Sequence, residues 1–181
     1  MKISKIHSLL ATLFVGLASM SLASCGSDDD DEPSGPATNP AYDNPALYKG
    51  TTTINEVNGA FEQAESSQTT DITYTVDFNL STNTLTVTCN NFKVPGFDSM
   101  PAMVVQFPDI PAVYDGDNFT FSAAAVNATA GGRPASEMVT ITDFEGSGKV
   151  GSGATLSVQY RCAVKGSVNK TFMVRASKLL P

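Results

Sequence analysis

The sequence is poor in two side chains that many active sites use. Its 181 residues contain one histidine, His7, and no tryptophan. His7 precedes a long apolar run, in a segment that we expect to be removed from the mature chain. A mature chain without imidazole lacks the usual base of a Ser–His or Cys–His pair and the commonest ligand of a zinc site. We therefore expect no metal, no cofactor and no catalytic residue, and a protein that is not an enzyme.

Basic residues are also scarce. Lysine and arginine number 11 against 18 aspartates and glutamates, which gives a formal net charge of −7. Proteins that bind nucleic acid usually present a basic patch, so we expect no nucleic-acid partner. Part of the acidity is local, because residues 28–32 read DDDDE. The chain is 41% hydrophobic, enough apolar material for one folded core.

The remaining carboxylates and glycines have the spacing of turns. Asp115 and Asp117 flank a glycine in YDGDN, where aspartate and asparagine commonly bond the local backbone. AGGRP and EGSGKVGSG match no phosphate-binding loop and are expected to be loops.

The first 24 residues are expected to form a signal peptide. Lys2 and Lys5 precede an apolar run, residues 9–22, which is shorter than the roughly 20 residues that cross a bilayer. Residues 22–25, LASC, resemble the bacterial lipobox, which implies that Cys25 is lipidated and anchors the mature protein to a membrane. The alternative is an ordinary secretory signal with a chance cysteine.

Residues 25–46 are expected to form an acidic, disordered tether. Like charges repel along the acidic run, and several prolines oppose regular structure. The run resembles the surface-export signal of Bacteroidetes lipoproteins, which implies an outer-membrane, cell-surface location and assigns that signal to Ser27, Asp28, Asp29, Asp30 and Asp31. If the run is only a solvated spacer, the domain faces the periplasm instead.

Residues 47–181 show the period of two that is typical of half-buried strands. In residues 71–80, DITYTVDFNL, apolar and polar side chains alternate, and a three-residue connection leads to a second strand from residue 84. Residues 55–65 could make one helical turn. Further strands are predicted at 48–54, 103–107, 118–123, 138–144, 154–164 and 171–177, with glycine-containing turns before the last two.

About eight antiparallel strands can close into a barrel or pack as a sandwich. Composition does not choose between them. Residues 47–59, 90–122, 139–150 and 155–166 together resemble the calycin-like β-barrel lipoproteins of Bacteroidetes. The resemblance implies an all-β domain with an eight-stranded, antiparallel up-and-down barrel related to lipocalins, with the β-sandwich as the alternative.

Two cysteines besides Cys25 fall on the apolar register of predicted strands. Cys89 and Cys162 are candidates for a disulfide, since an exported location permits oxidation. The competing interpretation is two separate buried thiols. Residues 98–100, DSM, resemble the O-glycosylation acceptor of Bacteroidetes, which makes Ser99 a candidate for modification.

An eight-stranded barrel is wide enough either to hold a small ligand or to be filled by its own side chains. Small residues at Ala123, Ala125, Ala154 and Ala176 predict a shallow apolar cavity at one open end. Its candidate lining is Tyr74, Phe78, Phe119, Phe121, Val158 and Tyr160. Two functions are compatible with these features: a binding module for a lipophilic or glycan-derived ligand, or a structural or protein-interaction lipoprotein with a filled barrel.

Overall fold

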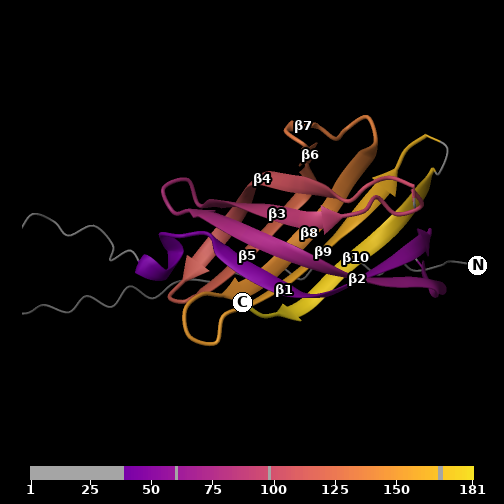
Figure 1. The fold of residues 1–181 in the computed structure, drawn as a ribbon. Coiled ribbons are helices and arrows are strands. Elements are labelled where there is room, and N and C mark those ends of the chain that lie inside the picture. The colour runs from indigo at the N-terminus through magenta and orange to yellow at the C-terminus, as the bar shows by residue number, and fades with distance from the viewer. Residues whose placement is uncertain (1–38, 60, 98, 167–168) are drawn as a thin grey trace, which may run out of the picture. The chain divides into compact units, whose positions relative to one another are not determined.

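Every strand predicted from the period of two is present in the computed structural model (Figure 1). The structure describes residues 39–59, 61–97, 99–166 and 169–181. The segment expected to be a signal peptide and most of the expected tether, with Cys25, Ser27, Asp28, Asp29, Asp30 and Asp31, lie outside these residues. The elements are η1 (Pro40–Tyr42, a 3-10 helix), β1 (Ala46–Asn58), β2 (Phe61–Asn79), β3 (Thr84–Phe92), β4 (Met103–Asp115), β5 (Asn118–Val126), β6 (Thr129–Ala130), β7 (Arg133–Pro134), β8 (Val139–Lys149), β9 (Thr155–Val164) and β10 (Lys170–Leu179).

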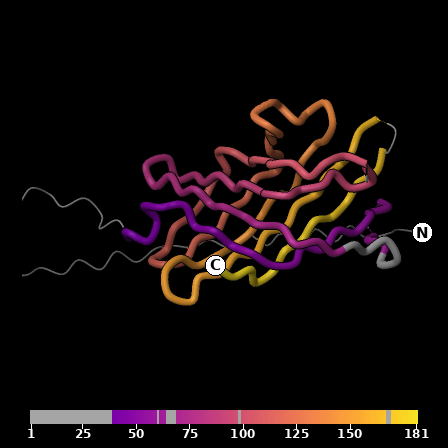
Figure 2. Tube along the Cα trace, in the orientation of Figure 1, coloured from indigo at the N-terminus to yellow at the C-terminus, as the bar shows by residue number. Residues whose placement is uncertain are grey.

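The eight long strands form a closed barrel. Around the ring the order is β1-β2-β3-β4-β5-β8-β9-β10, so each long strand pairs antiparallel with the next one along the chain. The ring closes where β10 pairs with β1, for example at Thr52 and Ala176 (Figure 2). This confirms the antiparallel up-and-down barrel and excludes the sandwich, since two separate sheets would not share this continuous ring of pairs.

Two local predictions were wrong. The segment expected to make a helical turn is instead the hairpin between β1 and β2, where Asn58 pairs with Phe61. Strand β4 does not stop at Phe107 but runs on through two prolines to Asp115. A β-bulge permits this: Asp109 adopts a left-handed φ of 53°, and the register against β3 shifts beside it.

Two glycines expected in a turn lie inside β8. Gly146 pairs with Phe121 of β5, and Gly148 pairs with Phe119. A Cβ built on Gly146 would lie 2.2 Å from Cζ of Phe121 and 2.4 Å from the Ser157 carbonyl oxygen. The phenylalanine rings therefore occupy the space that larger residues on β8 would fill. Only the second half of this glycine-rich segment, with Gly151 and Gly153, forms the turn to β9.

We expect Gly146→Ala to lower the free energy of unfolding by about 2 kcal/mol or more, because the new methyl group meets both a packed ring and a backbone oxygen. Ser147→Ala, on the exposed side of the same strand, is the matched control and should change stability by less than about 0.5 kcal/mol. Urea unfolding followed by circular dichroism compares the two. Equal stabilities would contradict the packing of Phe121 over Gly146.

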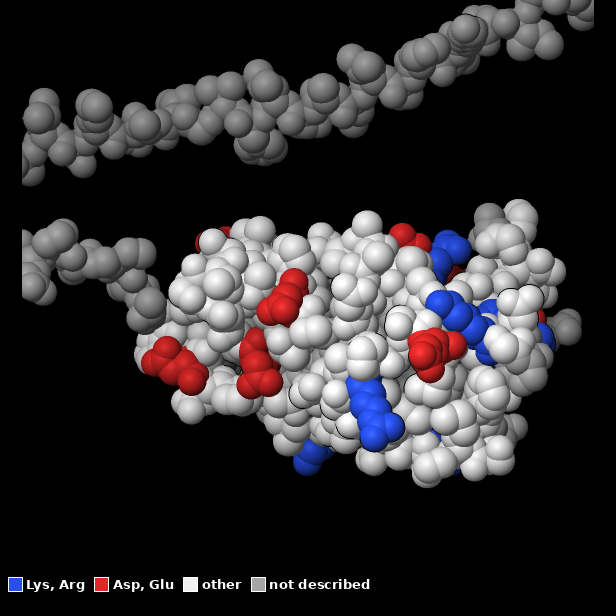
Figure 3. Space-filling model, turned by 90° about the horizontal axis from the view of Figure 1, so that it is seen from above, with Lys and Arg blue, Asp and Glu red and all other residues white. Residues whose placement is uncertain are grey.

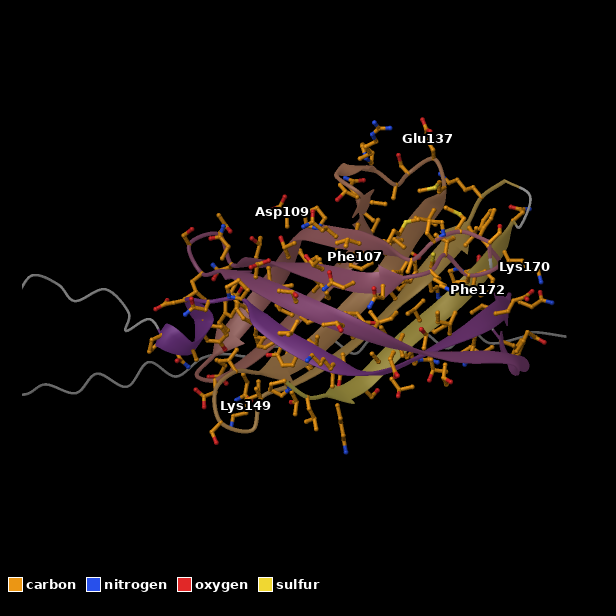
Figure 4. The ribbon with its side chains drawn as sticks, in the orientation of Figure 1. Phe107, Asp109, Glu137, Lys149, Lys170 and Phe172 are labelled. Atoms are coloured by element: carbon orange, nitrogen blue, oxygen red, sulfur yellow. The ribbon has the colours of Figure 1, made fainter. Side chains whose placement is uncertain are left out.

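Side chains fill the barrel. The largest fully buried ones are three tyrosines and three phenylalanines: Tyr48, Tyr74, Tyr160, Phe107, Phe119 and Phe144. Phe107 lies among the strands of the barrel in Figure 4. Such tight aromatic packing makes the barrel a rigid scaffold.

Candidate functional site

The side chains expected to line an interior cavity are part of the core. Tyr74, Phe119 and Tyr160 have at most 1% of their surface exposed, Phe121 and Val158 are also buried, and Phe78 is half-buried. The Tyr160 ring lies 5.1 Å from Phe107 and 5.2 Å from Phe144, centroid to centroid. The structure therefore corrects the expected end cavity around Phe119, Phe121 and Tyr160: neighbouring rings occupy that space. The sequence also pointed to neither Phe107 nor Phe144 as interior. Phe107 continues the alternation of Val105, whereas Phe144 comes three positions after Ile141, because a left-handed φ at Asp143 shifts the register of β8 there.

Cys89 and Cys162 are free, buried thiols, so the expected disulfide is not formed. Cys89 lies in β3 and Cys162 in β9, and three strands separate β3 from β9 in either direction around the ring. A disulfide needs Cα atoms within about 7 Å, whereas these residues lie on opposite walls. The alternative of two separate thiols is the one the structure shows.

A small polar cluster lies inside the barrel near Cys89. The hydroxyls of Thr52 and Tyr74 are hydrogen-bonded at 3.0 Å. Burial, followed by the nearby Cys89 and Tyr74, raises the pKa of Tyr160 well above its usual value. Among the described residues the Tyr160 hydroxyl has no hydrogen-bond partner. Burial likewise raises the pKa of Cys89, so both groups stay protonated and unreactive near neutral pH.

A groove of about 530 Å³ lies on the outer surface of the barrel, and we call it the outer-wall groove. Phe121, Val158 and Ala176 form its floor from the buried side of the wall, whereas Ser122 and Ser147 are exposed. This alternation places the groove outside the barrel. The full lining comes from five strands: Pro111, Ala112 and Val113; Thr120, Phe121 and Ser122; Glu145, Gly146 and Ser147; Ser157, Val158 and Gln159; Arg175, Ala176 and Ser177. Its outward side chains are mostly short, which leaves the wall hollowed there.

One side of the outer-wall groove carries a hydrogen-bonded row of polar side chains. The Gln159 amide donates to Glu145, and its oxygen accepts from Nε of Arg175 at 3.2 Å. Arg175 also pairs with Glu62, and this hydrogen bond, followed by one from Asn55, lowers the pKa of Glu62. Because each member holds the next, donors and acceptors are oriented before any ligand arrives.

A second pocket, of about 540 Å³, lies where β4 and β5 separate, and we call it the wall slot. Residues 108–111 of β4 line one side, and residues 122–127 line the other. Ala123 and Ala125, two of the alanines predicted to leave room, are among them. The room is therefore in the side wall rather than at an open end.

The other candidate residues are dispersed. Ser99 is exposed in the connection between β3 and β4. Asp115 and Asp117 lie at the β4–β5 turn as predicted, and Gly116 has the left-handed φ of 58° that this two-residue loop needs. In the described part of the chain, no three His, Cys, Asp or Glu side chains gather to hold a metal ion, and no helix is long and apolar enough to cross a membrane.

Neither a scan against protein-family models nor a search of curated proteins finds a match for this chain. Its function is therefore inferred from the geometry of the outer-wall groove and the wall slot.

Proposed function

We propose that the protein is a non-catalytic, lipid-anchored binding module of the cell surface, whose filled barrel is a scaffold and whose outer-wall groove binds a glycan-derived ligand. The observation that carries this proposal is the groove itself, with its row of oriented polar side chains. At about 530 Å³ it falls within the roughly 300 to 1,000 Å³ common for small-ligand sites.

The lining of the groove suits a ligand rich in hydroxyl groups. Arg175 supplies donors, Glu145 supplies acceptors and Gln159 supplies both, beside the hydroxyls of several serines. Val113, which is 67% exposed, and Pro111 offer apolar surface to the C–H face of a sugar ring. A lipophilic ligand has less support, since aromatic rings occupy the barrel interior. On the face shown in Figure 3, Lys, Arg, Asp and Glu side chains are scattered among a larger area of uncharged residues.

The groove is tested with a glycan array that carries host and bacterial oligosaccharides. We expect Ser147→Trp to weaken binding of the best oligosaccharide at least tenfold, because an indole would fill the groove. Thr140→Trp is the matched control: it lies on the same strand, is also exposed and is outside the groove. Failure of every oligosaccharide to bind, or equal binding by both variants, would contradict the proposed ligand class.

The lipid anchor rests on the sequence LASC at residues 22–25 and on the resemblance to calycin-like lipoproteins of Bacteroidetes. We expect Cys25→Ala to leave the protein unacylated and to move it from the membrane fraction to the soluble fraction, because acyl chains supply the membrane affinity. Detergent partitioning and mass spectrometry measure the change. A variant that still partitions with detergent would contradict the anchor and leave the groove proposal untouched.

A further inference from the structure

The wall slot opens where one backbone hydrogen bond between β4 and β5 cannot form. Asp115 and Asn118 flank a two-residue loop, so they form a pair joined by two backbone hydrogen bonds. Along an antiparallel pair of strands, such hydrogen-bonded pairs recur at every second residue. By that alternation Ser122 directs its N–H and C=O toward Pro111 of β4. Proline has no N–H, and the β4–β5 pairing ends one step earlier, at Ala112 and Phe121.

Beyond Pro111 the two strands stay apart over one short stretch. The bulge at Asp109 shifts β4, which pairs on this side again only at Val105 and Gln106, with β6. Meanwhile β5 keeps its pairing with β8 from Asn118 to Val126. The wall slot is thus closed at one end by the β4–β5 hairpin and at the other by β6.

Part of the β5 edge inside the slot is left without a strand partner. The Ser122 N–H faces the Pro111 carbonyl, which can accept from it, but the Ser122 C=O finds no N–H on this proline. By the same alternation the N–H and C=O of Ala124 face the slot, and the β4–β5 pairing does not extend to Ala124. Val126 follows in the same register, and its C=O accepts from Ala128 at 3.1 Å, which leaves its N–H facing the slot. An unpaired strand edge of this kind is a template for an added strand.

We propose that the wall slot binds an extended peptide segment of a partner protein, which adds to β5 over residues 122–126. The backbone edge supplies the affinity, and the alanines at 123, 124 and 125 leave room for the incoming chain. At about 3.4 Å per residue the slot accepts only about five residues, because both its ends are closed. This inference goes beyond the proposed glycan function and does not depend on it.

The carboxylate of Asp109 favours a peptide that carries a basic residue. Asp109 is the only ionisable side chain among the residues that line the slot. It is exposed and points away from the barrel in Figure 4. A lysine or arginine near the middle of the peptide can pair with this carboxylate, so the partner segment is a short strand with one basic residue and small or β-branched neighbours.

The probe is a library of acetylated five-residue peptides with a central lysine and flanking alanine, serine, threonine or valine, screened against the purified mature chain by fluorescence anisotropy. For the best member, we expect amide exchange at Ala124 and Val126 to slow at least tenfold on binding. The amides of Ala123 and Ala125, which face β8 in our register, are the internal reference and should already be protected in the free protein.

N-methylated peptides and the Asp109→Asn variant distinguish strand addition to β5 from non-specific binding of the peptide. N-methylation of the peptide nitrogens that face β5 should abolish binding, whereas N-methylation of the intervening nitrogens should leave it within about twofold. Asp109→Asn should weaken the lysine peptide several-fold and leave its alanine analogue unchanged; asparagine also tolerates the left-handed φ at this bulge.

Three results would overturn the proposal: no peptide binds, both N-methyl series lose binding equally, or Ala124 and Val126 are protected without peptide in a dimer seen by ultracentrifugation. The last result would assign the edge to a second copy of the chain. Ser147→Trp should leave peptide binding intact, so failure of the slot proposal and failure of the groove proposal are distinguishable.

Discussion

Phe144→Ala is expected to lower the free energy of unfolding by about 3 to 5 kcal/mol, a large part of the roughly 5 to 15 kcal/mol that stabilises a typical domain. The Phe144 side chain has no exposed surface. Its ring centroid lies 4.7 Å from Phe107, 5.2 Å from Tyr160 and 5.9 Å from Phe121. Removing the ring takes contacts from three aromatic neighbours that are held on separate strands, so the barrel cannot collapse fully into the space left behind.

Phe61→Ala is the matched control, because it deletes the same ring from a side chain that is 77% exposed at the tip of the β1–β2 hairpin. It should change stability by less than about 0.5 kcal/mol. Urea unfolding followed by circular dichroism suits both variants, since the chain has no tryptophan to report by fluorescence. If Phe144→Ala is no less stable than Phe61→Ala, the barrel is not filled as described, and an interior ligand site regains support.

Alkaline pH is expected to unfold the domain, because buried cysteine and tyrosine side chains keep their protons in the native state to higher pH than in the unfolded chain. Burial raises the pKa of the Cys162 thiol to about 12, and burial also raises the pKa values of Cys89, Tyr74 and Tyr160. These groups lose protons near their ordinary values, about 9.0 for cysteine and 10.0 for tyrosine, only when the chain is unfolded. Above those values the unfolded state binds fewer protons than the native state, so stability falls as pH rises.

The loss of unfolding free energy at alkaline pH is large enough to measure. Each such group removes up to about 1.4 kcal/mol for every pH unit above its unfolded-state pKa. The two thiols together remove about 3 kcal/mol by pH 10, and the tyrosines add to the loss above that pH. We expect stability to be constant between about pH 7 and 8.5 and unfolding to occur between about pH 10 and 11.

The double variant Cys89→Ala, Cys162→Ala isolates the thiol contribution. Between about pH 9 and 10, the free energy of unfolding of the double variant should fall less steeply with pH than that of the wild type. The difference in slope corresponds to up to two protons, one for each thiol, and it does not depend on the stability lost through the cavities left by the two sulfur atoms. Urea unfolding at a series of pH values gives the slope. A wild-type stability that does not change up to about pH 10.5 would contradict the burial of both thiols.

The filled core and the two surface features fit one division of roles. Aromatic side chains inside the barrel hold the eight strands in place, and this rigidity lets weakly polar surfaces on the wall keep a fixed shape. The outer-wall groove and the wall slot meet at Pro111 and Ser122, which line both. A ligand in one is therefore close to a ligand in the other, although each is proposed and tested separately.

The sequence by itself was sufficient for the presence of the eight long strands and for the all-β class of the fold, although not for the full length of β4. In residues 71–80 the alternation of apolar and polar side chains is a local property, and it specifies a strand with one buried face wherever that strand is placed. The loop YDGDN was equally local, because Gly116 supplies the backbone conformation that its own turn requires. The scarcity of imidazole was also evident from composition alone, because His7 is the one histidine of the 181 residues.

Only the tertiary structure decided how distant residues meet. Gly146 belongs to a strand because Phe121, 25 positions earlier in the numbering, covers it from the neighbouring strand. Cys89 and Cys162 share an apolar register but lie on opposite walls, since ring order rather than register sets their separation. Whether the aromatic residues line a cavity or fill it depends on Phe107 and Phe144 as partners across the barrel. The slot at Pro111 also depends on two strands. The Ser122 carbonyl of β5 faces a proline of β4 that has no N–H to donate, and neither segment alone predicts that these two residues lie opposite each other.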